Sequence, residues 1–261
     1  MIIIESDHVN EWCIMSVIFW IIFWIVIAAV AFLPLYFIFL FINGLLFVNM
    51  KKEYDEDSKY FRFLLNNSTA IAVWLLRIRI TVTGREKLPE GRFLLVSNHR
   101  SKFDPILSWH VFAKENLSFI SKPENFKVPV YGRIIHRCCF MPIDRENPRN
   151  ALKTIQRAVK LIKNDVASVA VYPEGTRNYG EGLLPFHNAV LKIAQKAEVP
   201  IVVMTVKGTY EIQKNYPWRR SDVQMDIIDV LQPEEIKGVK TNILGDRIAE
   251  MMLNNLEGNA Q

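Results

Sequence analysis

The sequence predicts an α/β domain in which a mixed sheet, with at least some parallel strands, is flanked by helices. Short apolar runs typical of buried strands alternate with segments whose apolar residues recur at helical spacing. Two of these runs end in polar clusters, at 97–105 and 172–177. A stretch without charged residues, from Trp12 to Met50, precedes the domain and predicts a membrane segment.

The uncharged stretch is far longer than the roughly 20 residues that one membrane-spanning helix needs. Pro34 divides it, and Gly44 weakens its second half. Two arrangements are open: a single long, kinked helix, or a helical hairpin that enters the bilayer and returns, with Pro34 near its tip. Lys51 and Lys52 follow directly, so the positive-inside rule places the remainder of the chain on the cytoplasmic face of the membrane.

These patterns divide the chain into three parts. Residues 1–52 form the membrane segment, 53–76 a linker with an interfacial helix, and 77–261 the domain that carries both polar clusters. The mostly apolar stretch 61–76 has a polar interruption at 66–69. We interpret it as a helix that either lies on the membrane surface or packs on the domain.

Within the domain, apolar runs predict strands at 79–83, 93–96, 117–120, 138–143, 167–172, 201–206 and 223–230. Apolar spacing and capping signals predict helices at 106–113, 128–136, 147–163, 189–197 and 242–256. Asn147 and Pro148 suit the cap and the first position of the third of these helices. Because strands alternate with helices, part of the sheet should be parallel.

Composition narrows the kinds of partner. Of the 261 residues, 50% are hydrophobic, and the formal net charge is +5. A basic chain favours anionic partners, namely membrane phospholipids, phosphate-bearing substrates or coenzyme A. Nucleic acid is not expected, because no DNA- or RNA-binding signature accompanies the charge. Cys13, Cys138 and Cys139 show neither metal-ligand spacing nor a disulfide pattern, so no metal site is expected.

The first polar cluster places His99 and Asp104 on a turn between a predicted strand and a predicted helix. In open α/β sheets, ligands bind outside the carboxyl ends of strands. The two side chains would lie off a common face of one continuous helix, but on a turn they can meet. The carboxylate would then hold one imidazole nitrogen and leave the other to take a proton. The alternative is that Asp104 only caps the helix and His99 is an ordinary turn residue.

Together the two clusters resemble motifs of the glycerolipid acyltransferase family, which includes 1-acylglycerol-3-phosphate acyltransferases. The family's Asn-His-x-x-x-x-Asp block (its HX4D motif) and its Glu-Gly-Thr-Arg block match at Asn98, His99, Asp104, Glu174, Gly175, Thr176 and Arg177. Two weaker blocks, at 140–145 and 199–203, fit in the expected order. The resemblance covers residues 78–230 and implies a sheet flanked by helices of the glycerol-3-phosphate acyltransferase type.

The resemblance implies a membrane-bound enzyme of phospholipid synthesis. A fatty acyl group would pass from acyl-CoA or acyl-carrier protein to the 2-hydroxyl of 1-acylglycerol-3-phosphate (lysophosphatidic acid), giving phosphatidic acid without a cofactor. His99 would be the general base and Asp104 would orient it. The implied acceptor and phosphate site comprises Arg145, Glu174, Gly175, Thr176 and Arg177, with Asn98 and Ser101 as candidate supporting residues. Backbone N–H groups near Arg100 and Gly175 are candidate oxyanion donors.

One departure from the family pattern leaves the acceptor open. Many relatives carry Phe-Lys-x-Gly after the Glu-Gly-Thr-Arg block, whereas this chain has Phe186, His187, Asn188 and Ala189. The acceptor could therefore be glycerol-3-phosphate or another lysophospholipid. Two further alternatives are a non-catalytic lipid-binding membrane protein of the same fold and a thioesterase that uses water.

Overall fold

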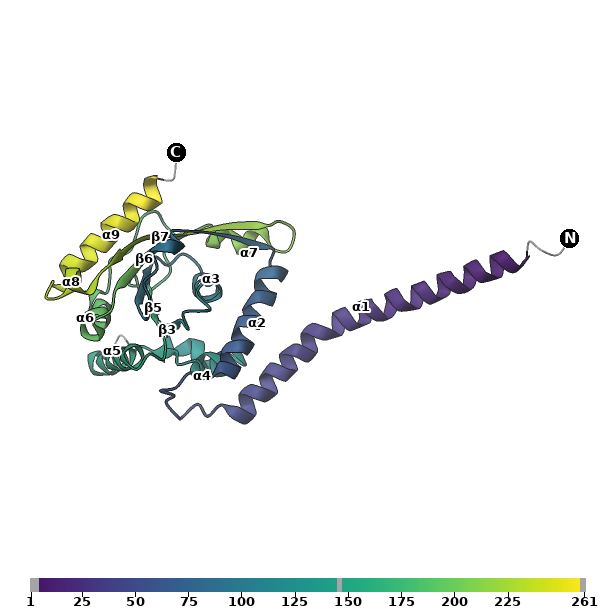
Figure 1. Cartoon of the computed structure of the whole chain (residues 1–261), viewed down its shortest axis with the longest axis horizontal. Coiled ribbons are helices and arrows are strands. Elements are labelled where there is room, and N and C mark those ends of the chain that lie inside the picture. The colour runs from purple at the N-terminus through teal and green to yellow at the C-terminus, as the bar shows by residue number, and fades with distance from the viewer. Residues whose placement is uncertain (1–4, 145–146, 259–261) are drawn as a thin grey trace. The chain divides into compact units, whose positions relative to one another are not determined.

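The computed structural model describes residues 5–144 and 147–258, and the chain divides into two compact units between Asn49 and Met50. The first unit consists of α1 (Glu5–Phe47), a single continuous helix that includes Pro34 (Figure 1). Of the two arrangements that the sequence left open, the structure has the unbroken helix. Its stretch from Ile14 to Phe47 is long and apolar enough to cross a membrane, judged by length and composition.

The second unit is built on a seven-stranded sheet with the order β1-β7-β6-β2-β5-β3-β4. The strands are β1 (Ile78–Thr83), β2 (Leu94–Ser97), β3 (Ser118–Ser121), β4 (Met141–Pro142), β5 (Val169–Val171), β6 (Ile201–Lys207) and β7 (Ser221–Leu231). All neighbouring strands are parallel except β6 and β7, which are antiparallel. The predicted mixed α/β sheet is therefore confirmed.

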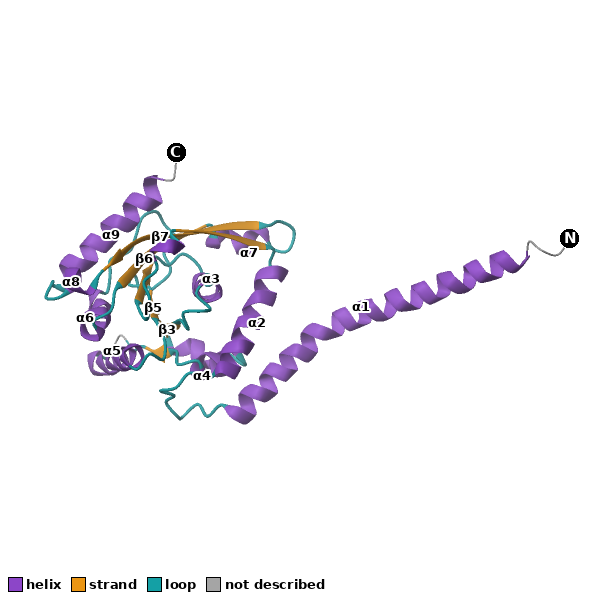
Figure 2. Ribbon diagram, viewed as in Figure 1, coloured by secondary structure: helices purple, strands orange, loops and turns teal. Residues whose placement is uncertain are grey.

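Helices cover both faces of the sheet (Figure 2). They are α2 (Lys59–Leu75), α3 (Asp104–Val111), α4 (Tyr131–Arg137), α5 (Pro148–Lys163), α6 (Lys192–Ala197), α7 (Ile212–Asn215), α8 (Pro233–Ile236) and α9 (Thr241–Gly258). Short 3₁₀ turns occur at η1 (Arg85–Lys87), η2 (Pro123–Lys127), η3 (Asn188–Leu191) and η4 (Thr209–Glu211). Asn147 caps α5, where its side chain accepts hydrogen bonds from the N–H groups of Arg149 and Asn150.

Strand β2 lies in the middle of the sheet and is buried along its whole length. Successive side chains of a strand point to opposite faces. Leu94 and Val96 accordingly join the core cluster formed with α5, α6 and α9. Phe93, directly before the strand, stacks edge-on against Phe112 beyond the end of α3. Burial on both faces explains why this segment is continuously apolar rather than alternating.

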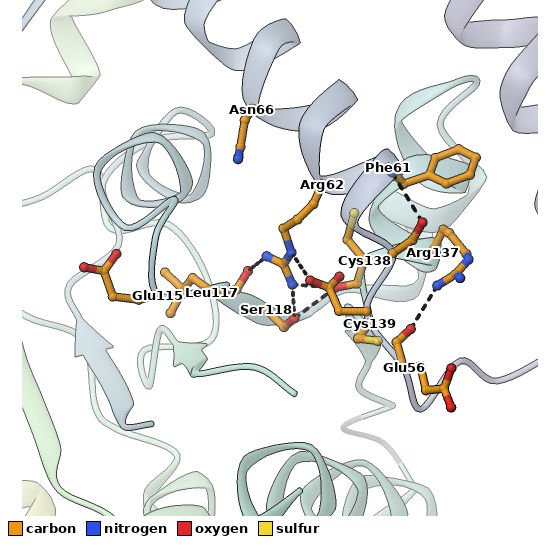
Figure 3. Close-up of polar contacts among 12 residues, drawn as sticks. Glu56, Phe61, Arg62, Asn66, Glu115, Leu117, Ser118, Arg137, Cys138 and Cys139 are labelled. Atoms are coloured by element: carbon orange, nitrogen blue, oxygen red, sulfur yellow. Dashed lines mark hydrogen bonds and ion pairs between the residues drawn. The ribbon is translucent and has the colours of Figure 1, made fainter. Parts of the chain in front are cut away.

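Helix α2 is attached to the sheet through a buried arginine. Arg62 donates hydrogen bonds to the carbonyl oxygen of Leu117 (2.8 Å), the hydroxyl of Ser118 (3.3 Å) and the carbonyl oxygen of Cys138 (3.4 Å). Figure 3 shows its guanidinium pointing into this group of acceptors. The interfacial helix predicted from sequence is thus packed on the domain along the face that carries Arg62.

The segment 138–143 differs from the predicted strand, because only Met141–Pro142 forms one. Cys138 caps the carboxyl end of α4, and Cys139 has a positive φ of 61°. The N–H of Phe140 donates to the carbonyl of Ile135 (3.1 Å), which closes the helix end in the manner of a Schellman motif. The apolar run is therefore shared between a helix terminus and a short strand.

Candidate active site

The sheet brings the two polar clusters together. Strands β2 and β5 are adjacent and parallel, with Val96 opposite Val171. Because parallel strands end at the same edge, the segments that follow them emerge side by side. His99 and Glu174 each follow this matched pair at the same distance along the chain, and the N–H of His99 donates to Oε1 of Glu174 (2.7 Å).

His99 and Asp104 form the central contact of the site. Nδ1 of His99 lies 2.8 Å from Oδ2 of Asp104, and the carboxylate is fully buried. The same oxygen accepts the backbone N–H groups of Arg100 (2.6 Å) and Ser101 (2.7 Å). The carboxylate accepts the proton on Nδ1, so the tautomer is fixed and Nε2 is the nitrogen that can take a proton. The imidazole is 18% exposed.

Tyr172 supports the imidazole from one side. Its ring stacks on that of His99, with centroids 4.5 Å apart and planes at 20°. Its hydroxyl lies 3.3 Å from the hydroxyl of Ser108 on α3. Burial, with the nearby charge of Asp104, raises the pKa of Tyr172 well above its ordinary value, so this phenol stays neutral. The stacking restricts rotation of the imidazole about the Cβ–Cγ bond of His99.

Glu174 acts on the backbone of the site. It is buried, and its two carboxylate oxygens accept the N–H groups of His99 and Leu184 (2.9 Å for Leu184). Burial raises the pKa of Glu174, an effect that these two hydrogen bonds oppose. Glu174 is not among the residues that line the cavity described next, so the structure places it behind the turn that carries His99.

His99 opens into a cavity of about 380 Å³. Among the described residues, three with cationic side chains line this cavity together with Gly175 and Thr176: Lys102, Lys122 and Arg177. Lys122 follows β3, the strand next to β5, so its position arises from the same sheet edge. The sequence predicts no role for Lys102 or Lys122. The order of strands, which the sequence alone did not reveal, brings both to the cavity.

A second cavity, of about 420 Å³, shares Ile120, Tyr172 and Gly175 with the first. Its wall is mostly apolar and includes Ile143, Pro148, Ala151, Leu152, Ile155, Val171 and Val190. A compartment that carries cations beside apolar and aromatic residues therefore shares a wall with a compartment that is mostly apolar. This combination suits an amphipathic ligand with a phosphate and a hydrocarbon chain.

The two candidate supporting residues lie inside the protein. The buried side chain of Asn98 donates to the carbonyl of Val206 (3.0 Å) and accepts its N–H (2.7 Å), which ties the turn to β6. The hydroxyl of Ser101 accepts the N–H of Phe103 (3.3 Å). Neither residue lines the cationic cavity. Both positions therefore stabilise the turn.

The expected oxyanion donors are already engaged. The N–H of Arg100 donates to Asp104, and the N–H of Gly175 donates to the carbonyl of Tyr172 (2.9 Å). The buried carboxylate and the tight turn at Gly175, where φ is 72°, account for these contacts. The oxyanion donors near these two residues stay a prediction.

Arg145 lies outside the described residues. The preceding strand β4 pairs in parallel with β3, with Ile120 opposite Met141. Within residues 5–144 and 147–258, no group of three or more His, Cys, Asp or Glu side chains is placed to hold a metal ion.

The sequence and the fold were compared with known proteins. The acyltransferase family profile matches residues 79–207. A 1-acyl-sn-glycerol-3-phosphate acyltransferase of Cocos nucifera is 29% identical over 153 residues, covering 59% of this chain and 47% of that protein. A chloroplastic 1-acyl-sn-glycerol-3-phosphate acyltransferase of Brassica napus is 30% identical over 223 residues, covering 82% of this chain and 62% of that protein. The matched region thus spans about half the length of several such relatives.

A crystal structure of the 1-acyl-sn-glycerophosphate acyltransferase PlsC from Thermotoga maritima has the same fold. Its TM-score is 0.63 at 24% identity, over 88% of this chain and 96% of that one. This likeness shows the architecture that holds the two cavities.

Proposed function

Since this chain carries a domain of the acyltransferase family, we propose that it is a membrane-bound acyltransferase of phospholipid synthesis. It moves a fatty acyl group from acyl-CoA or acyl-carrier protein to the 2-hydroxyl of 1-acylglycerol-3-phosphate and so forms phosphatidic acid. The observation that carries the proposal is the contact of 2.8 Å between Nδ1 of His99 and Oδ2 of the buried Asp104, with His99 in the wall of a cavity that carries cations.

In the proposed reaction, His99 is the general base. Nε2 takes the proton of the 2-hydroxyl while the hydroxyl oxygen attacks the thioester carbonyl carbon. Asp104 holds the ring and stabilises the imidazolium that forms. The tetrahedral intermediate then collapses, the carbon–sulfur bond breaks, and the imidazolium returns its proton to the leaving thiolate. The thioester is already activated, so no serine or cysteine nucleophile is needed.

The cationic wall supports binding of the acceptor phosphate. Arg177 is exposed to the cavity and presents a planar fork that matches two phosphate oxygens. Lys102 and Lys122 add positive charge in the same cavity. Thr176 and Gly175 form the rim beside Arg177. Arg145 keeps the phosphate role that the family resemblance implies for it.

The apolar cavity supports binding of an acyl chain. It adjoins the cationic cavity along Tyr172 and Gly175, so a chain placed there has its polar end near His99. Each methylene that leaves water contributes about 0.8 kcal/mol. Leu152 of α5, which is 46% exposed, lies at this cavity.

The proposed location is a membrane, with the catalytic unit on its cytoplasmic face. The apolar stretch of α1 supports the membrane, and Lys51 and Lys52 directly after it support the orientation. Phospholipids are then the immediate surroundings of the enzyme and the source of its acceptor.

A different acceptor is the second candidate. His187 and Ala189, which replace the lysine and glycine of many relatives, both line the apolar cavity. The departure therefore lies where part of the substrate would bind. Glycerol-3-phosphate or a lysophospholipid with a larger headgroup would use the same base and donor.

The test is an acyltransfer assay with the purified full-length protein. Acyl-CoA and acyl-carrier protein are each combined with 1-acylglycerol-3-phosphate, glycerol-3-phosphate or lysophosphatidylcholine. We expect phosphatidic acid from the first acceptor, no transfer by His99→Ala, and ordinary transfer by the control His110→Ala on α3. Turnover of His99→Ala at the wild-type rate would refute the assignment of His99 as the general base. If no acceptor receives an acyl group, a lipid-binding protein is favoured. If fatty acid is released without an acceptor, a thioesterase is favoured.

A further inference from the structure

The second oxygen of Asp104 makes a contact that the proposed mechanism does not use. The hydroxyl of Thr209 donates a hydrogen bond of 2.5 Å to Oδ1 of Asp104. Both residues are 0% exposed. Thr209 lies beyond the end of β6 and is 105 residues away from Asp104 in the chain.

We propose that Thr209 is a positioning residue for the His99–Asp104 pair. Its hydroxyl fixes the plane of the carboxylate, so that Oδ2 faces Nδ1 of His99. The inference rests on the proposed function, in which His99 is the base.

The other hydrogen bonds of Asp104 do not fix this plane by themselves. Oδ2 accepts Nδ1–H of His99 and the backbone N–H groups of Arg100 and Ser101. These three donors all belong to one short turn, so they can move together with the carboxylate. The terminal torsion of an aspartate is intrinsically broad. Thr209 holds the opposite oxygen from η4, which follows another strand of the sheet, so it is an independent constraint.

The fold delivers Thr209 to this place accurately. Strand β6 pairs with β2, with Ser97 opposite Met204, and Asn98 bonds both polar atoms of the Val206 backbone. Gly208 then has a φ of +83°, and a Cβ built there would lie 2.3 Å from the carbonyl oxygen of Asp222. A glycine is therefore required between β6 and Thr209.

Burial gives the contact its strength. A carboxylate without water needs a donor for each oxygen, because an unpaired buried acceptor is costly. Without the hydroxyl, the carboxylate can turn about its terminal torsion, which weakens the contact between Oδ2 and Nδ1 of His99. That contact makes Nε2 a better proton acceptor, so its loss should make the imidazole less reactive.

Three variants of the full-length protein test the inference kinetically. Thr209→Val, which keeps the shape and removes the hydroxyl, should lower kcat about tenfold or more with little change in KM for the acceptor. Thr209→Ser, which restores a hydroxyl, should recover most of the loss. In an Asp104→Asn background, Thr209→Val should add little further loss. If the loss of kcat in the double variant equals the product of the losses in the two single variants, Thr209 does not act through Asp104. That result would overturn the proposal.

A second readout needs no turnover. Carbethoxylation of His99 by diethyl pyrocarbonate at neutral pH, followed by peptide mass spectrometry, reports the reactivity of its ring. The exposed His187 is the internal control. Thr209→Val should lower the rate of carbethoxylation of His99 and leave that of His187 unchanged. An unchanged or higher rate for His99 would overturn the positioning role. If the wild-type protein transfers no acyl group, the proposed function fails, while this readout still decides whether Thr209 controls the pair.

Discussion

The buried Arg62 should be one of the largest single contributors to the stability of the second unit. Its side chain is 6% exposed, and its Nε lies 2.6 Å from Oδ2 of Asp57, which is 12% exposed. The other guanidinium nitrogens reach acceptors on Leu117, Ser118 and Cys138 (Figure 3). The guanidinium carbon also lies 4.5 Å from the centroid of the Trp109 ring.

Arg62→Met keeps the aliphatic stem and removes every donor. Asp57 then remains as a buried charge without its partner, and two carbonyl oxygens lose a hydrogen bond. Removal of one member of a buried ion pair costs about 3–5 kcal/mol. The free energy of unfolding of a domain is about 5–15 kcal/mol, so Arg62→Met should remove a large part of it. The control is Arg247→Met, because its ion pair with Glu235 is 47% and 42% exposed and is worth at most about 1 kcal/mol.

The assay is denaturant unfolding of the full-length protein in detergent, followed by near-ultraviolet circular dichroism. We expect a much lower midpoint for Arg62→Met than for Arg247→Met, with a similar slope. Addition of Asp57→Leu to Arg62→Met should recover part of the loss, because the unpaired charge is removed. Equal midpoints for Arg62→Met and Arg247→Met would refute this account of how α2 is held.

Three further predictions concern the site and the thiols. Arg177→Ala should raise KM for the phosphate-bearing acceptor by about tenfold with a smaller change in kcat, and an unchanged KM in steady-state kinetics would contradict the phosphate role. Glu174→Gln should destabilise the unit by about 1–3 kcal/mol, because an amide cannot accept both the His99 and Leu184 N–H groups. Burial raises the pKa of Glu174 above 4.5, so the difference in free energy of unfolding between the wild type and Glu174→Gln should decrease as pH rises through the raised pKa. Unfolding measurements across pH check this expectation, and a difference that grows with pH would contradict it. Burial raises the pKa of Cys138 and raises that of Cys139 to about 11, so both should resist iodoacetamide at neutral pH until the protein unfolds, as peptide mass spectrometry would show.

The parts of the fold that follow from local pattern were predictable. The apolar runs around Leu94 and Val169, and the polar residues after them, identify two strands and the turns that end them. The adjacency of parallel strands then suffices to bring His99 near Glu174. The parallel arrangement itself follows from alternation of strands and helices.

Other features depend on contacts across the sheet, for which the chain carries no local signal. Nothing in the sequence around Thr209 indicates its contact with Asp104, because that contact depends on the pairing of β6 with β2. Lys122 likewise gains its place from the position of β3. Cys138 and Cys139 continue an apolar run, yet the hydrogen bonds that close α4 place them at a helix terminus. Tertiary contacts override local propensity at these positions.

The order of the strands also has a consequence for biosynthesis. Strand β2 is made early, but its two neighbours in the sheet, β5 and β6, begin at Val169 and Ile201. At about 5–20 residues per second, a ribosome needs several seconds to pass from the codon of His99 to that of Thr209. Until β5 and β6 have been made, both edges of this buried strand lack their partners. Nascent chains that stop short of Thr209 should therefore carry an incomplete, chaperone-dependent domain.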